Sequence, residues 1–322
     1  MKKIAVIGGG DSAEIIISKK SRATIVANLD SAKYEIFPVL MEGLKWVVEL
    51  NDKEYPINKS DFSVSIEGKV IQFDYAYITI HGTPGEDGKL QAYFDLLGIP
   101  YNTPSQLTSA ITFNKWTCNT LLKQIGINCA KSVLLRKHDS IDTHNILDSL
   151  GLPCFVKPND GGSSFGASKV KLPNELIPAI EKAFEHGKEV IIEEMLSGTE
   201  VTCGIVQLND ELKVLGITEI VSENEFFDYQ AKYEGKSKEI TPARITNEEE
   251  TKIHTCVKHI YKQLGIKGVV RIDFMIQQGI PYVIEVNTTP GMSAQSIIPQ
   301  QTQYTGLTLT QLFDDIITNS WN

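Results

Sequence analysis

The chain has 322 residues, 42% of them hydrophobic and 22% charged, and its formal net charge at pH 7 is −9. This length supports a large buried core in two or three lobes, no apolar run reaches the length of a membrane span, and the negative charge argues against general binding to nucleic acid or anionic membranes. The five cysteines lack a C-x-x-C pair, which indicates reduced core residues of a cytoplasmic protein.

The first hundred residues alternate between strand and helix patterns, with strands expected at 4–7, 35–40, 75–80 and 100–102 and helices at 11–28 and 90–97. This order predicts a doubly wound parallel sheet. Gly8-Gly9-Gly10-Asp11-Ser12-Ala13 matches the G-x-G-x-x-A dinucleotide fingerprint, but the second strand lacks the acidic residue expected at its end. A nicotinamide-dependent oxidoreductase is therefore one hypothesis, and a helix N-terminus that faces an anionic group is the other.

A glycine-rich loop lies in the middle of the chain. Thr103-Pro104-Ser105 predicts a domain boundary, and later elements are expected as helices at 109–125 and 145–150 and strands at 154–157 and 168–170. The segment 158–166 between the last two strands lacks P-loop spacing, yet its backbone N–H groups suit a triphosphate, and Lys157 precedes it. A plain hairpin turn with an exposed lysine is the alternative interpretation.

A strand that ends in acidic residues follows. The expected elements are a helix at 175–185, strands at 189–195, 199–206 and 212–220, a long loop at 222–238, and helices at 247–264 and 307–317. Glu193 and Glu200 flank the apolar pair Met195-Leu196. Such an arrangement fits a hinge that holds adenine and ribose, and a surface turn is the alternative.

The most informative pattern is a pair of strands at 268–276 and 281–287, joined by a short turn. Side chains two positions apart share a strand face, so Arg271 lies with Asp273, and Glu285 lies with Asn287. If the strands pair, two carboxylates and an amide oxygen meet beside one guanidinium. That set suits Mg²⁺ with substrate phosphates and the stabilisation of negative charge during group transfer. Solvated charges on an outer face are the alternative.

Together these segments resemble the D-alanine–D-alanine ligases, carboxylate–amine ligases of the ATP-grasp family, over nearly the whole chain. The matching motifs, in order, are residues 8–14, 81–88, 157–158 with 162–166, 193 with 196–200, 228–233, 271–273, 285–292 and Ser296. The resemblance implies an α/β (α+β) protein with a doubly wound N-terminal parallel sheet followed by a two-lobed ATP-grasp fold. The implied domains are a substrate-binding domain at 1–103, a central lobe with the glycine-rich loop at 104–196, and a C-terminal lobe with the metal site and a mobile loop at 197–322.

The resemblance also implies a role for each site residue. ATP would be held by Lys115, Lys157, Ser164, Glu193, Leu196, Glu200 and Lys232, with Glu193 and Leu196 at the adenine and Glu200 at the ribose. Two Mg²⁺ ions, with Mn²⁺ as a substitute, would be held by Asp273, Glu285 and Asn287. Amino-acid binding and catalysis would fall to Glu14, His81, Ser163, Tyr233, Arg271, Gly291, Ser296 and Ile297. Among these, Glu14 would pair with the ammonium of the first D-alanine, Arg271 and the Gly291 N–H with the oxyanion, and Ser296 and Ile297 with the second carboxylate.

The implied activity is ATP-dependent ligation of two D-alanines through an acyl phosphate, for peptidoglycan precursors, by a cytoplasmic homodimer. The presence of Tyr233 favours an amine nucleophile over D-lactate. Ile15, Asn114 and Glu194 depart from the residues common in relatives. The competing hypotheses are an ATP-grasp ligase of another amino-acid pair, the oxidoreductase, and a nonenzymatic ATP-binding regulator.

Overall fold

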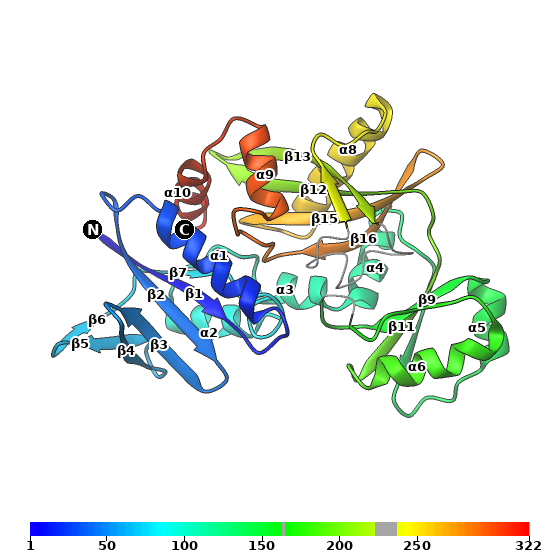
Figure 1. Ribbon diagram of the computed structural model, residues 1–322, viewed down its shortest axis with the longest axis horizontal. Helices are drawn as coiled ribbons and strands as arrows, with labels where there is room; N and C mark the ends of the chain where they lie inside the picture. The colour runs from blue at the N-terminus through cyan, green and yellow to red at the C-terminus, as the bar shows by residue number, and fades with distance from the viewer. Residues whose placement is uncertain (163–164, 223–236, 322) are drawn as a thin grey trace.

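The computed structural model describes residues 1–162, 165–222 and 237–321 (Figure 1). Three sheets follow one another along the chain, and each forms the centre of one lobe. None of the helices described is both long and apolar enough to cross a lipid bilayer.

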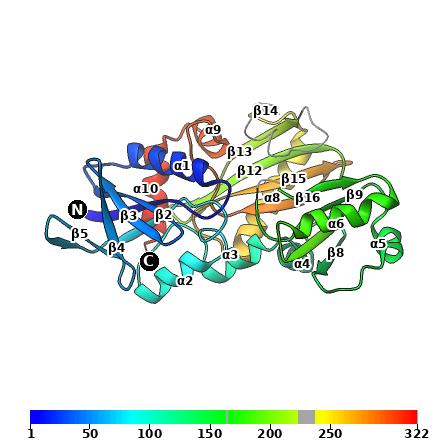
Figure 2. The same ribbon diagram turned by 60° about the horizontal axis from the view of Figure 1, so that its bottom comes forward.

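The first lobe is built on a seven-stranded sheet with the order β6-β5-β4-β3-β2-β1-β7. Its elements are β1 (Lys2–Gly9), α1 (Ile15–Asn28), β2 (Tyr34–Glu42), β3 (Lys45–Leu50), β4 (Lys53–Asn58), β5 (Ser63–Ile66), β6 (Lys69–Ile71), β7 (Tyr75–Ile78) and α2 (Lys89–Leu97). β1 pairs in parallel with both β2 and β7, as predicted. Alternate residues of β1 face opposite helices: Ile4 packs in one core cluster with Ile25 of α1, and Ile7 packs in another with Phe94 of α2. The sheet therefore has a helix on each face (Figure 2).

The strands β3 to β6 form an antiparallel extension of the sheet, in a region where the sequence predicted no strands. These four strands are short. The turn between β3 and β4 is made by Asn51 and Asp52, which both have left-handed backbone conformations, with φ of 50° and 58°. Such a turn matches the twist of a hairpin but usually carries glycine, so the sequence signal is weak. The N-terminal sheet is thus mixed, with its parallel part at β2, β1 and β7.

The central lobe has a four-stranded sheet with the order β10-β9-β11-β8. Its elements are α3 (Gln106–Phe113), α4 (Lys115–Gln124), β8 (Ser132–Arg136), α5 (Thr143–Leu150), β9 (Cys154–Pro158), β10 (Ser168–Val170), η1 (Pro173–Glu175), α6 (Leu176–Phe184) and β11 (Glu189–Glu194). The single helix predicted at 109–125 is wrong, because Asn114 divides it into α3 and α4. The Asn114 side chain accepts a hydrogen bond from the Thr117 N–H at 2.9 Å, which caps α4 and makes Lys115 its first residue.

The third lobe contains an antiparallel sheet with the order β14-β13-β12-β15-β16. Its elements are β12 (Thr199–Leu208), β13 (Glu211–Ser222), β14 (Ser237–Ile240), α8 (Asn247–Gln263), β15 (Val269–Gln277), β16 (Ile280–Asn287), α9 (Ile297–Tyr304) and α10 (Leu309–Asn319). The predicted hairpin is confirmed, with Asp273 opposite Glu285 and Arg271 opposite Asn287. The alternate residues of β15, Ile272 among them, pack beneath the sheet against α8.

The C-terminal helix joins the first and third lobes. Leu312 and Phe313 of α10 share one core cluster with Ile4 of β1 and Val206 of β12. Beyond α10, the Trp321 ring stacks on Tyr75 with 5.3 Å between ring centroids. The third lobe is therefore packed on the first lobe through α10, and helix α8 covers the other face of the sheet of the third lobe (Figure 1).

Gly268, just before β15, allows a close approach between the first and third lobes. A Cβ at this position would lie 1.8 Å from the backbone oxygen of Asn102, whereas one at Gly265 would meet nothing within 4 Å, and both glycines have positive φ. We expect Gly265→Ala to lower the free energy of unfolding by about 1–2 kcal/mol, the cost of a left-handed alanine. Gly268→Ala must also displace backbone, so urea denaturation should show a clearly larger loss; equal losses would contradict this packing.

Candidate active site

Two cavities meet between the lobes. One, of about 470 Å³, lies between the central sheet and the β15–β16 hairpin, and the other, of about 740 Å³, lies between α1, the sheet of the third lobe and the start of α9. Both are lined by Glu14, Gly162, Glu200, Asp273 and Glu285. The cleft is therefore continuous, and the two carboxylates of the hairpin stand where its two halves join.

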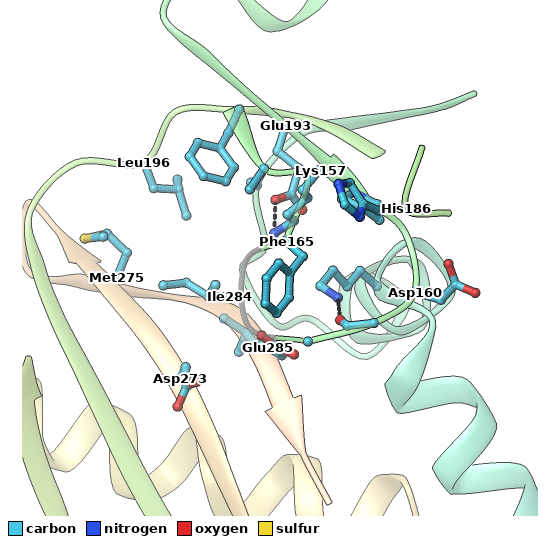
Figure 3. Close-up of a pocket in the computed structure, with 18 of the residues that line it drawn as sticks. Lys157, Asp160, Phe165, His186, Glu193, Leu196, Asp273, Met275, Ile284 and Glu285 are labelled. Carbon is cyan, nitrogen blue, oxygen red and sulfur yellow. Dashed lines mark hydrogen bonds and ion pairs between the residues drawn. The ribbon is translucent and has the colours of Figure 1, made fainter. Parts of the chain in front are cut away.

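The first cavity has an apolar wall that ends at an acid. Leu196, Met275 and Ile284 line one side of the pocket in Figure 3, and Phe155 and Ala130 also face it. The buried carboxylate of Glu193 accepts a hydrogen bond from the Asn119 side-chain amide at 3.0 Å. Its other oxygen lies 2.6 Å from the Lys157 ammonium. A flat apolar slot with one orienting acid is the chemistry that a purine base requires.

Two lysines border the glycine-rich segment of the same cavity. The Lys115 ammonium is buried and donates to the backbone oxygen of Gly161 at 2.5 Å. Burial lowers the pKa of Lys115, and the charge of Glu285 opposes that shift. The buried Asn159 ties this segment to α4, since its side chain accepts from the Trp116 N–H at 2.8 Å and its backbone oxygen from the Lys115 N–H at 3.0 Å. Both lysines thus lie within reach of an anion in this pocket.

Asp273 is the most highly bonded carboxylate of the hairpin. It accepts from the Thr202 hydroxyl at 2.5 Å, from Arg271 Nε at 2.9 Å and Nη2 at 3.0 Å, and from the Asn287 amide at 3.0 Å. The predicted convergence of these residues with Glu285 is present in the strand register. Their role as metal ligands stays a prediction.

The donor set nevertheless fits a hard cation. Two carboxylates and an amide oxygen on one sheet face suit Mg²⁺, which takes its remaining ligands from water and phosphates. The described residues contain no cluster of three or more His, Cys, Asp or Glu side chains that could enclose a metal. Asn287 would present its oxygen after a half-turn of the amide, a flip that leaves the shape of the side chain unchanged.

Glu14 and His81 are ionisable groups of the second cavity near α1. Glu14 lies against the glycine-rich segment, since its Oε2 atom is 2.8 Å from where a Cβ would stand on Gly162. His81 is buried, and burial lowers its pKa while the charge of Glu14 raises it. The predicted helix at 11–28 begins only at Ile15, because residues 11–14 form a turn in which the Ser12 hydroxyl donates to the His81 oxygen at 2.7 Å. That turn places Glu14 at the cleft.

The start of α9 forms the opposite end of this cavity. Ser296 is the N-cap of α9, and its hydroxyl lies 2.8 Å from that of Ser293. Gly291 packs against it, since a Cβ there would stand 2.8 Å from the Ser296 hydroxyl. Ile297 follows as the first helical residue and also lines the cavity, so the N-terminus of α9 lies at its edge. The second cavity therefore brings together Glu14 and His81 with Ser296 and Ile297, all of which the sequence predicted for amino-acid binding.

Four predicted residues, Ser163, Ser164, Lys232 and Tyr233, lie outside the described residues.

Two residues of the cleft received no role from the sequence. Glu86 is half-buried and accepts hydrogen bonds from the Gly82 N–H at 2.7 Å and the Thr289 N–H at 3.2 Å, and desolvation together with the charge of Glu14 raises its pKa to about 7. Thr202 lies on β12 two positions after Glu200, on the same face, and bonds to Asp273. Glu86 stands in the motif at 81–88, and strand alternation alone points to Thr202.

Comparisons with known proteins agree over the full chain. The family models described as D-ala D-ala ligase N-terminus and C-terminus match residues 3–104 and 121–318. A D-alanine–D-alanine ligase of Phocaeicola vulgatus is 49% identical over 322 residues, which is 99% of each protein. The VanG D-Ala:D-Ser ligase from Enterococcus faecalis superposes with a TM-score of 0.89 at 35% identity, covering 100% of this chain and 99% of that one. The D-alanine–D-alanine ligase of Bacillus anthracis complexed with ATP gives 0.81 at 34%, covering 99% and 97%.

The raised pKa of Glu86 predicts a pH-dependent contribution to stability. In the folded state Glu86 holds its proton up to about pH 7, whereas an ordinary glutamate loses it near pH 4.5. The contribution of Glu86 to the free energy of unfolding is therefore complete below pH 4.5 and is lost as the pH rises through 7. Glu86→Gln carries no such proton, so its free energy of unfolding should improve relative to wild type by up to about 3 kcal/mol between pH 4.5 and 8. Urea denaturation across this range measures the difference, and a pH-independent difference would refute the assignment.

Proposed function

The chain belongs to the D-alanine–D-alanine ligase family, and we propose that it joins two D-alanines to D-alanyl-D-alanine with ATP, as a step in peptidoglycan precursor synthesis. The continuous cleft carries this proposal. The cleft contains, in order, an apolar slot with Glu193, two lysines, the carboxylates Asp273 and Glu285, and the N-terminus of α9. That order matches a nucleotide base, its phosphates, the transferred phosphoryl group and the amino acids.

ATP would lie in the first cavity. The base would rest on Leu196, Met275 and Ile284 with its amino group toward Glu193, and Glu200 would hold the ribose. Lys115 and Lys157 would approach the phosphates as point charges. Ser164 and Lys232 belong to the same proposed set. For Lys157 this requires its ammonium to exchange the Glu193 carboxylate for a phosphate oxygen.

Asp273, Glu285 and Asn287 would hold two Mg²⁺ ions, with Mn²⁺ able to replace them. Bound there, the ions would neutralise the charge of the transferring phosphoryl group. Thr202 and Arg271 keep the Asp273 carboxylate in a single orientation, since both donate hydrogen bonds to it. The protein therefore supplies an ordered donor set before any ligand arrives.

The two amino acids would occupy the second cavity. Glu14 and His81 would receive the first D-alanine, whose carboxylate oxygen attacks the terminal phosphorus of ATP to give an acyl phosphate and ADP. Ser296 and Ile297 would receive the carboxylate of the second D-alanine. Its ammonium group must first lose a proton; the neutral amine then attacks the acyl carbon, inorganic phosphate leaves, and the nitrogen releases a second proton as the amide forms. Arg271 and the Gly291 N–H would stabilise the oxyanion of that step, and Ser163 and Tyr233 would link to Glu14 to close the site.

The structure argues against the oxidoreductase hypothesis. A dinucleotide site needs a helix N-terminus directly after the glycines, so that its N–H groups face the pyrophosphate. Here residues 11–14 form a turn instead, and α1 begins at Ile15. The glycines serve to bring Glu14 to the cleft.

The organisation of the protein completes the proposal. We propose that residues 1–103, 104–196 and 197–322 are its three domains, that the enzyme acts in the cytoplasm, and that it is a homodimer. Light scattering coupled to size exclusion measures the mass of the assembly directly.

Substrate choice is the first test of this function. We expect purified protein with ATP and Mg²⁺ to release phosphate with D-alanine, and much more slowly with L-alanine or D-lactate. D-Serine is the informative competitor, because the solved VanG relative is named a D-Ala:D-Ser ligase. Phosphate release with identification of the dipeptide by mass spectrometry is the measurement. Equal turnover of L-alanine would remove the claim of D-specificity.

Metal dependence is the second test. Chelation with EDTA should stop turnover, and added Mg²⁺ or Mn²⁺ should restore it. Asp273→Asn removes one negative ligand, so the Mg²⁺ concentration for half-maximal activity should rise about tenfold or more. Asp148→Asn is the matched control, because Asp148 is exposed on the surface and its carboxylate lies 3.4 Å from the His144 ring nitrogen, which the proposed function does not use. An unchanged Mg²⁺ requirement in Asp273→Asn would exclude this carboxylate as a ligand.

A further inference from the structure

Glu239, an acid with no role in the proposed function, also lines the second cavity. Glu239 of β14 stands opposite Ile220 of β13, which stands opposite Glu200 of β12. Directly paired residues of antiparallel strands share a face, so the three side chains form a row on the cleft face of the sheet. All three line the second cavity. Glu239 is at the outer end of that row.

Helix α9 holds the Glu239 carboxylate in place. The Gln300 side-chain amide donates to Glu239 Oε2 at 3.0 Å and to the backbone oxygen of Gln295 at 2.9 Å. Gln300 is one helical turn beyond Ser296, the N-cap of the same helix. The bond from Gln300 engages only the Oε2 atom, and the Glu239 side chain lines the cavity.

Apart from Glu200, Asp273 and Glu285, to which the proposed function already gives the ribose and the metal ions, the acids of this cavity divide into two groups. Glu14 and Glu86 interact electrostatically with each other, and Glu14 also interacts with His81, on the side proposed for the first amino acid. Glu239 instead interacts with Arg271, and it is bonded to the helix proposed for the second amino acid. Each amino acid arrives with one ammonium group. The division therefore supplies a separate carboxylate for each.

We propose that Glu239 binds the ammonium group of the second amino acid while the N-terminus of α9 holds its carboxylate. This inference rests on the proposed ligase function and adds a specificity-determining residue to it. A hydroxy acid such as D-lactate lacks the ammonium group, so its binding would leave the Glu239 carboxylate desolvated without a cationic partner. A site built to pair a charged group rejects an analogue that lacks its partner.

Glu239→Gln is the direct test, because glutamine keeps the length of the side chain and an oxygen for the Gln300 amide. Initial-rate kinetics separate the KM for D-alanine at the first and second sites. We expect the second-site KM to rise about tenfold or more, the effect of losing a charge-assisted hydrogen bond. The first-site KM and the KM for ATP should stay within twofold, and the preference for D-alanine over D-lactate should fall. Glu248→Gln is the control, since Glu248 is 79% exposed on α8 and pairs only with Lys252.

Two more variants separate recognition from a structural effect. Glu239→Asp keeps the charge and should retain a second-site KM closer to wild type than Glu239→Gln does. Gln300→Met keeps the carboxylate but removes its contact with α9, so it should raise that KM less than Glu239→Gln. An equal rise in Gln300→Met, or an unchanged second-site KM in an active Glu239→Gln enzyme, would overturn the inference. Failure of the wild type to form a dipeptide would instead refute the proposed function.

Discussion

The antiparallel pairing of β15 with β16 is the interaction on which the cleft depends. It sets Asp273 opposite Glu285 and Arg271 opposite Asn287, so four polar side chains leave one face of the sheet together. The other face carries Ile272 and Phe274 into the core beneath α8. A slip of one residue would bury the charges and expose the apolar side chains. The hydrophobic core therefore holds the register, and the register holds the site.

A buried glutamine extends this order from the hairpin to the amino-acid end of the cleft. Gln301 of α9 donates to the Thr202 oxygen at 3.1 Å and the Thr218 hydroxyl at 3.0 Å, and it accepts from the Gly204 N–H at 3.0 Å. Thr202 in turn donates to Asp273. A Cβ on Gly204 would lie 2.4 Å from the Gln301 oxygen, so the close contact requires glycine. Helix α9 is thereby fixed to β12, the strand that pairs with β15 and so lies beside Asp273.

The first lobe reaches the same site by a separate route. The core that α10 shares with β1 and β12 sets the distance between the first and third lobes. Hydrogen bonds across the junction hold the segment after β16 in two places: the Met292 N–H donates to the Ser21 hydroxyl of α1 at 3.0 Å, and the Thr289 hydroxyl donates to the Ile80 oxygen, just before His81, at 3.0 Å. Glu14 and the start of α9 therefore face each other across one cavity, although 282 positions of sequence separate Glu14 from Ser296.

The sequence by itself determined the strands of the hairpin and the polar face they share, because side chains alternate with a period of two and the apolar positions between Arg271, Asp273 and Glu285 need a core. It also predicted the parallel strands around β1 and the family, through motifs whose spacing is local. It did not reveal that Asn114 ends one helix and caps the next, since the same residue is acceptable within a continuous helix pattern. The strands between residues 45 and 71 were likewise hidden by their short lengths and, at Asn51 and Asp52, by a turn without the usual glycine. Only the tertiary structure decided the surroundings of each acid: the charge of Glu14 acts on Glu86, and Gln300 holds Glu239, through contacts between segments far apart in the chain. Burial and charge environment depend on those distant neighbours, and no local pattern records them.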